Sequence, residues 1–376
     1  MRVVGIMSGT SLDGIDVAVV DLGGVDLGGS GVATVAFGTV PYPDGTRTRI
    51  LAVSNTACST AQISRLNFEL GELYAGAVRK VCADGAVPLE SIDLIGCHGQ
   101  TVYHEGSGPS PNTLQLGEAD VIAERIGAPV VSGFRTRDIA AGGLGAPLVP
   151  LADYLLFGNP GIGRVALNIG GIANITVLRA GAAPDETVAF DTGPGNMVVD
   201  QLVERMTGGA RRYDQDGGSA ATGRVDAGLL GQLLRNPYYR QPPPKTAGRE
   251  QYGREFVDSL VGTGIGWPDL IATATELTAA TVAESILHTA PWVEEVAVGG
   301  GGVHNDWLMG RIRALLPGVR VASTAEYGVD PDAREAIAFA VLAHRTWHRQ
   351  TGNLPSATGA RHAVVLGKVS FCENRF

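Results

Sequence analysis

The sequence predicts an α/β protein of two domains. A chain of 376 residues is longer than one typical hydrophobic core supports. Short apolar runs typical of buried strands alternate with longer amphipathic segments typical of helices. A strand, a glycine turn and a second strand also occur twice, beginning near Val3 and near Val165. We therefore expect one domain at 1–150, a second at 151–350, and a tail at 351–376.

Composition excludes several classes of protein. A hydrophobic content of 44% with 18% charged residues is typical of a globular, well-buried chain. A net charge of -9 argues against a nucleic-acid or anionic-membrane partner, because both need a basic face. The four cysteines form no metal-finger or CxxC spacing, and no apolar run has the length of a membrane span. The chain begins directly with a predicted core strand, so we expect a cytoplasmic protein without a targeting segment.

The first repeat places a polar turn between two buried strands. Val3–Met7 and Ile15–Val20 are the predicted strands, and the turn between them is rich in glycine and hydroxyl residues. Backbone N–H groups in such a turn form a concavity that binds anions, and glycines let phosphate oxygens approach. Carboxylates nearby suit a magnesium-bound phosphate, although an ordinary glycine hairpin is the alternative. The predicted nucleotide-binding residues here are Gly9, Thr10, Ser11, Leu12, Asp13, Gly14, Ile15 and Asp16, with Asp13 as the metal partner.

Polar residues follow a short buried strand at 94–97. His98 and Gln100 come directly after it, and Arg135 follows a further short strand at 129–131. Open α/β sheets bind ligands at the carboxyl ends of their strands, although a buried structural histidine is the alternative for His98. The other predicted elements of this half are a strand at 32–40, helices at 60–82, 118–125 and 148–157, and a flexible joint at 140–147.

The second repeat ends in an aspartate. Strands at 165–169 and 173–178 flank Gly170 and Gly171, and a third strand at 187–190 ends at Asp191. A helix at 197–206 follows. A carboxylate between a strand end and a helix start suits catalysis or metal binding, and helix capping is the alternative.

A strand, four glycines and a helix follow later in this half. The strand is 296–298 and the helix 305–315, and Gly299, Gly300, Gly301 and Asn305 give a backbone surface for a nucleotide base and ribose. The remaining predicted elements are a proline-rich loop at 238–253, a helix at 268–288, a strand at 319–323, a helix at 332–347 that contains Glu335, and an edge strand at 363–369.

These parts resemble a two-domain actin-like ATPase, a duplicated ribonuclease H-like fold with an interdomain cleft. Over nearly its whole length the sequence resembles the anhydro-N-acetylmuramic acid kinase family. One departure is Thr246-Ala247, where the family has Ser-Thr after its lysine. The motifs that carry the resemblance are GIMSGTSLDGID (5–16), GCHGQT (96–101), RDIAAGGLGAPLVP (137–150), LNIGGIANIT (167–176), FDTGPGN (190–196), GGGGVHN (299–305) and the segment from Glu326 to Glu335.

The resemblance implies a reaction and roles for these residues. ATP, with Mg²⁺, and water would convert 1,6-anhydro-N-acetylmuramic acid to N-acetylmuramic acid 6-phosphate and ADP, in peptidoglycan recycling. Asp191 would be the general base for water, the first hairpin would hold the phosphates, and the four glycines would hold adenosine. His98, Gln100, Arg135 and Glu335 would contact the sugar, with Arg135 or Arg137 suited to its carboxylate. The resemblance also implies a homodimer.

Three alternatives stay open at this point. The chain could be a kinase for another amino sugar or anhydrosugar, or a non-metabolic actin-like ATPase that drives conformational change. It could also be a glycosidase that works without ATP through Asp191 and a second carboxylate. Phosphate-type turns argue against the glycosidase. The three lysines, Lys80, Lys245 and Lys368, are not placed for a P-loop.

Overall fold

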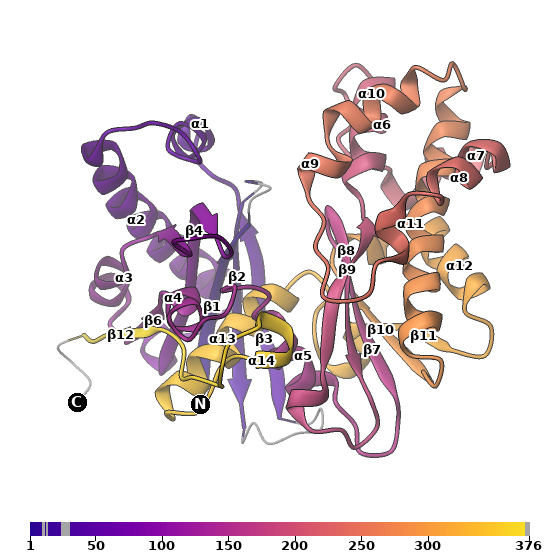
Figure 1. The fold of residues 1–376 in the computed structure, drawn as a ribbon. Coiled ribbons are helices and arrows are strands. Elements are labelled where there is room, and N and C mark those ends of the chain that lie inside the picture. Colours follow the sequence, from indigo (N-terminus) through magenta and orange to yellow (C-terminus); the bar gives the residue numbers. More distant parts are fainter. Residues whose placement is uncertain (10–11, 13, 24–30, 373–376) are drawn as a thin grey trace. The chain divides into compact units, whose positions relative to one another are not determined.

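The computed structural model describes residues 1–9, 12, 14–23 and 31–372, in two compact units (Figure 1). Unit 1 combines Met1–Leu156 with Gly328–Phe376, and unit 2 is Phe157–Tyr327. The sequence places 328–350 in the second domain, whereas the structure groups this segment with unit 1. The reason is that the helix of this segment, α13 (Arg334–Trp347), packs on the sheet of unit 1.

Unit 1 is built on a seven-stranded sheet with the order β12-β6-β4-β1-β2-β3, and β5 pairs with β4. The pairs β1·β2 and β2·β3 are antiparallel, and β1·β4 and β4·β6 are parallel. The strands are β1 (Arg2–Ser8), β2 (Ile15–Leu22), β3 (Val32–Val40), β4 (Leu94–Glu105), β5 (Asn112–Leu116), β6 (Val130–Ser132) and β12 (Lys368–Ser370).

The fourth strand is longer than the sequence predicts. We expected it to end at Cys97, but β4 continues to Glu105 because its second half pairs with β5 as an antiparallel hairpin. The parallel contact of β4 with β6 ends at Cys97, and that with β1 ends at Gln100. His98 and Gln100 therefore lie where the parallel part of the sheet ends, inside a continuous strand.

Helices cover both faces of this sheet. The α2 helix begins at a capping box in which Ser59 and Gln62 satisfy each other's backbone N–H groups. On the opposite face α13 (Arg334–Trp347) packs directly on β1 and β4. Gly5 and Gly96 allow this close packing, since a Cβ atom at either position would overlap carbonyl groups of α13. The helices are α1 (Thr46–Leu51), α2 (Thr60–Asp84), α3 (Ala119–Ile126), α4 (Phe134–Ala140), α5 (Val149–Phe157, ending at the unit boundary), α13 (Arg334–Trp347) and α14 (Pro355–Thr358).

Unit 2 repeats the same strand order. Its five-stranded sheet runs β11-β10-β7-β8-β9, with β7·β8 and β8·β9 antiparallel and β7·β10 and β10·β11 parallel. The order β3-β2-β1-β4-β6 in unit 1 has the same directions, so the duplicated α/β fold predicted from the sequence is confirmed. The strands are β7 (Arg164–Ile169), β8 (Ile172–Leu178), β9 (Val188–Pro194), β10 (Glu295–Gly299) and β11 (Arg320–Ser323).

The core of unit 2 lies between this sheet and two helices. Apolar residues of β7, β8 and β10 pack with Ala279 and Val282 of α11 and with Leu308 of α12. Among the described residues α11 alone is long and apolar enough to cross a membrane, and 78% of that stretch is buried inside the protein. The helices are α6 (Met197–Met206), α7 (Gly218–Thr222), α8 (Ala227–Leu233), α9 (Arg249–Tyr252), α10 (Arg254–Val261), α11 (Trp267–Thr289) and α12 (Asp306–Leu315).

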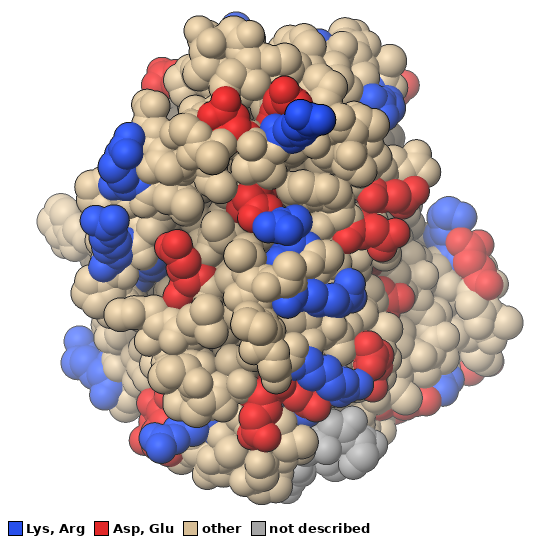
Figure 2. Space-filling model, turned by 90° about the vertical axis from the view of Figure 1, so that its right-hand side faces the viewer, with Lys and Arg blue, Asp and Glu red and all other residues tan. Residues whose placement is uncertain are grey.

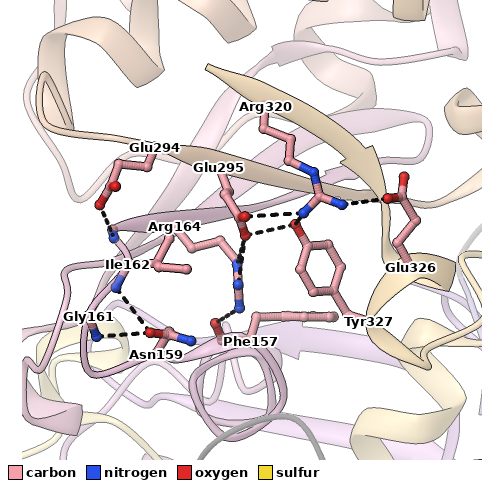
Figure 3. Close-up of polar contacts among 11 residues, drawn as sticks. Phe157, Asn159, Gly161, Ile162, Arg164, Glu294, Glu295, Arg320, Glu326 and Tyr327 are labelled. Carbon is pink, nitrogen blue, oxygen red and sulfur yellow. Dashed lines mark hydrogen bonds and ion pairs between the residues drawn. The ribbon is translucent and has the colours of Figure 1, made fainter. Parts of the chain in front are cut away.

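A cluster of charges joins the amino ends of the parallel strands of unit 2 (Figure 3). Arg164 at the start of β7 forms an ion pair of 2.7 Å with Glu295 of β10 and also donates to the carbonyl oxygen of Phe157. Arg320 of β11 donates to the second carboxylate oxygen of Glu295 at 3.1 Å. The Tyr327 hydroxyl donates to Glu295, and its ring lies 4.4 Å from the Arg164 guanidinium. This cluster therefore binds Phe157 and Tyr327, the first and last residues of unit 2.

Charged side chains are mixed on the face in Figure 2, where basic and acidic groups lie close to one another.

Candidate active site

Buried polar side chains form hydrogen bonds with the first hairpin of unit 1. The Ser8 and Tyr74 hydroxyls form a hydrogen bond of 2.7 Å, and both side chains are almost fully buried. Gln100 donates from Nε2 to the carbonyl oxygen of Gly9 at 3.3 Å and accepts from the Tyr42 hydroxyl at 3.3 Å. Gln100, predicted to bind sugar, thus supports the backbone of the predicted phosphate turn.

The other predicted residues of this hairpin divide into groups. Thr10, Ser11 and Asp13, the predicted metal partner among them, lie outside the described residues. The Leu12 and Ile15 side chains belong to the hydrophobic core, so only their backbone groups can face a ligand. Gly14 packs closely against Thr39 and Val40, and the Asp16 carboxylate accepts a hydrogen bond of 2.6 Å from the Thr39 hydroxyl.

His98, which is buried, and Arg135, which is partly buried, form a pair in unit 1. The Nε and Nη2 atoms of Arg135 lie 3.1 and 2.9 Å from His98 Nε2, and the histidine ring packs on Phe339 of α13. Burial and the neighbouring guanidinium hold the pKa of His98 well below its usual value, so the ring is neutral. Because Nε2 accepts from Arg135, Nδ1 carries the proton, and this N–H is buried beside the Gly99 backbone, which partly offsets the fall in the pKa of His98.

Glu335 at the start of α13 lies near this pair. Burial lowers the pKa of Arg135 to about 10, and the charges of Glu335 and Asp138 oppose that shift. Arg135 also donates to the Gly145 carbonyl oxygen at 2.7 Å. Three of the four predicted sugar residues, His98, Arg135 and Glu335, are thus brought together, although 237 residues separate the first from the last.

Asp138 is an important residue that the sequence prediction missed. It is fully buried and accepts hydrogen bonds from the backbone N–H of Gly145 and from Asn353 and Thr358. The predicted flexible joint at 140–147 is therefore tied to the carboxyl-terminal segment of unit 1. Its proximity in sequence to Arg135 was the available signal.

A cavity of about 540 Å³ lies in unit 1 beside this region. His98 is the only one of the four predicted sugar residues that lines it, so the cavity extends away from the Arg135 pair. Its other walls come from α2, β5, β6, α4 and β12, with Asn67, Gln115, Ser132, Thr136 and Lys368 as polar members.

Asp191 occupies the middle of β9 in unit 2, paired in register with Asn174. Its Oδ2 atom accepts a hydrogen bond of 2.8 Å from the backbone N–H of Ala247. Its Oδ1 atom accepts no hydrogen bond from the described part of the chain. Burial, with a smaller contribution from Glu250, raises the pKa of Asp191 to about 6. A carboxylate with one fixed and one available oxygen, titrating near neutrality, is suited to general base catalysis.

The second hairpin lies against the segment that follows Asp191. The carbonyl oxygen of Gly170 accepts a hydrogen bond from the backbone N–H of Asn196, and that of Gly171 accepts from the N–H groups of Gly195 and Met197. Gly195 must be glycine, because a Cβ atom there would overlap the Gly170 carbonyl. A Cβ atom on Gly170 would make only ordinary van der Waals contacts, the nearest at 3.7 Å, so packing does not require glycine there.

The four-glycine turn serves packing as well as access. A Cβ atom on Gly300 would clash with Asn168 and Ile169, and one on Gly302 would overlap the Ile169 side chain. Gly300 also has a φ of 81°, a conformation that favours glycine. A Cβ atom on Gly301 would make only an ordinary van der Waals contact, with the Asn196 side chain at 3.8 Å.

Two predicted nucleotide residues near this turn have structural contacts. Gly299 ends β10 and pairs with Asn168. The Asn305 side chain accepts from the Leu308 N–H and caps α12.

Comparison with known proteins shows the family of this chain. The family model for anhydro-N-acetylmuramic acid kinase matches residues 1–372. A Caldanaerobacter subterraneus subsp. tengcongensis protein of that name is 44% identical over 98% of this chain and 96% of its own length. The Salinibacter ruber protein of the same name is 45% identical with the same coverage. The Bacillus cereus (strain Q1) one is 41% identical over 99% of both chains. The chain therefore belongs to the anhydro-N-acetylmuramic acid kinase family.

Proposed function

We propose that the chain opens 1,6-anhydro-N-acetylmuramic acid with water and transfers the γ-phosphoryl group of ATP to O6. Water forms a bond to C1 and the bond from C1 to O6 breaks. O6 then takes the phosphoryl group, and ADP leaves. The products are N-acetylmuramic acid 6-phosphate, ADP and one proton. The names of the relatives support this substrate, and the net charge of -9 and the composition agree with a cytoplasmic metabolic enzyme.

The observation that carries the proposal is the environment of Asp191. With a pKa of about 6 the carboxylate is mostly ionised at pH 7, yet basic enough to accept a proton from water. The Ala247 N–H fixes Oδ2, and Oδ1 is the oxygen that would take the proton. Because the departing O6 is captured by phosphorus rather than by a proton, one carboxylate is sufficient where an inverting glycosidase needs two.

The nucleotide would be held mainly by backbone donors. We place phosphate and ribose next to the main chain at Gly170 and Gly301 in unit 2, where a Cβ atom would make only ordinary contacts. In unit 1 the Gln100 amide donates a hydrogen bond to the Gly9 carbonyl oxygen, which suits a rigid phosphate-binding turn.

Magnesium would neutralise phosphate charge in this reaction. The described residues contain no group of three or more metal-ligating side chains. That agrees with an ion held chiefly by phosphate oxygens and water, with Asp13 as the proposed protein partner.

The pair of Arg135 and His98, with Glu335, would recognise the sugar. A guanidinium can bind the lactyl carboxylate through two parallel hydrogen bonds.

One assay tests the proposed function. ADP release is measured with and without the anhydrosugar, and the product is analysed by mass spectrometry after reaction in ¹⁸O water. We expect sugar-dependent ADP release, with the label at C1 and none in the phosphate ester. Equal ADP release without sugar would favour an ATPase with another role, and label in the ester would exclude attack of water at C1.

A further inference from the structure

The segment from Tyr238 to Ala247 binds the main chain and the carboxylate of Asp191. The Tyr238 hydroxyl donates to the Asp191 carbonyl oxygen at 2.7 Å, and the Asp191 N–H donates to the Lys245 carbonyl oxygen at 3.2 Å. The Ala247 N–H reaches Oδ2 of Asp191 at 2.8 Å. The aspartate is thus held from both sides by one loop that lies about 50 residues away in sequence.

The same loop buries a lysine beside the aspartate. Lys245 is 7% exposed, and it has no carboxylate partner among the described residues. Its Nζ atom donates to the carbonyl oxygens of Tyr238 and Tyr239, each at 3.2 Å. The ammonium also lies 4.8 Å from the centre of the Tyr238 ring and 5.4 Å from that of Phe190. Burying an ammonium group without an anion is unfavourable, so this placement calls for a specific role.

The contacts define that role. The lysine ammonium binds the start of the loop, whereas its backbone carbonyl and the nearby Ala247 N–H bind Asp191. The side chain of Lys245 therefore closes the loop into a ring, and closure directs the Ala247 N–H at the carboxylate.

We propose that Lys245 is a positioning residue for Asp191, acting through the loop backbone to leave one carboxylate oxygen fixed and the other available. This inference rests on the proposed function only for the role of Asp191 as the base. Lys245→Met keeps the length of the side chain and removes both hydrogen bonds, so the loop should detach from Asp191.

Release of the loop should change the titration of Asp191. The titratable groups that interact electrostatically with this carboxyl are Glu250, Tyr238 and Tyr252, and Lys245 lies in the same loop. Burial is the largest cause of the raised pKa of Asp191, so exposing the carboxyl should lower this pKa despite loss of the Ala247 hydrogen bond.

The test is a ¹³C NMR titration of the ligand-free full chain, with the Asp191 signal assigned from Asp191→Asn. We expect Lys245→Met to move the Asp191 midpoint down by about one pH unit and to reduce kcat by roughly tenfold or more, with KM for ATP within about threefold. Lys245→Arg, which keeps the donors, should restore part of both. Lys80→Met, at an exposed lysine, is the control and should change neither.

A second measurement needs no variant of the loop. The chain has only Lys80, Lys245 and Lys368, so ¹⁵N-lysine labelling gives a simple Nζ spectrum. The Lys245 signal should shift with the Asp191 midpoint and lose that dependence in Asp191→Asn. A folded Lys245→Met with the wild-type midpoint, or a Lys245 signal insensitive to Asp191, would overturn the proposal. Absence of product from the wild type, with the NMR coupling intact, would overturn the proposed function instead.

Discussion

Asp191→Asn should abolish turnover and at the same time stabilise the protein above pH 6. The amide keeps the shape and an oxygen that accepts from Ala247, but it cannot take a proton from water. General base catalysis contributes about 10²–10⁴-fold, so kcat should fall by that factor while both substrates still bind. In the wild type, kcat should fall as the pH drops below about 6, where Asp191 becomes protonated.

The effect on stability follows from linkage. The pKa of Asp191 is about 6 in the folded state and 3.8 as the model value. Folding is therefore favoured most at low pH, and this contribution is lost as the pH rises from about 4 to above 6. A shift of about two pKa units corresponds to roughly 3 kcal/mol, since one unit is about 1.36 kcal/mol. The asparagine has no charge, so it avoids this cost.

Urea unfolding of wild type and variant at several pH values measures this difference. Trp267, Trp292 and Trp307 lie in unit 2, so tryptophan fluorescence reports mainly on that unit. The free energy of unfolding of the variant, relative to wild type, should increase by about 1–3 kcal/mol between pH 4 and pH 7. An identical pH dependence in both proteins, or near-normal turnover by the variant, would refute the reasoning about Asp191.

Three further predictions concern packing, charge and the sugar. Gly5→Ala should lose about 1–3 kcal/mol of stability because its Cβ atom overlaps α13. Gly76→Ala, in open space on α2, should gain up to about 1 kcal/mol. Thermal unfolding of the two variants measures both changes. Glu295→Ala should lower the free energy of unfolding in urea by about 3 kcal/mol, because the buried Arg164 loses its carboxylate partner. An equal loss from Glu72→Ala, which removes an exposed ion pair, would contradict this reasoning. Arg135→Lys cannot form paired hydrogen bonds, so steady-state kinetics should give at least a tenfold higher KM for the anhydrosugar with little change for ATP; an unchanged KM would remove Arg135 from the sugar site.

The sequence by itself determined the repeated unit and the positions of its glycine turns. Period-two and period-3.6 hydrophobic patterns are local, so they located β3 and α6 at the observed bounds and β1, β2, β7 and α11 within two residues at each end. The glycine turns were visible for the same reason, because each follows a strand directly. Asp191 was expected just after a strand that ends at 190, whereas β9 continues past it to Pro194.

The tertiary structure decided which segments meet. Nothing local indicates that α13 returns to β1, since this packing depends on Gly5 and Gly96 leaving room for a helix more than 200 residues later. Gln100 looked like a ligand residue, yet its amide supports the Gly9 turn because β1 and β4 lie side by side.

Asp191 illustrates the same division. Its identity was visible in the sequence, but its basicity comes from burial under a loop and its orientation from the Ala247 N–H and the enclosed Lys245. Hydrophobic periodicity reports whether a residue is buried, whereas hydrogen-bond partners and pKa values depend on groups that only the folded chain brings together.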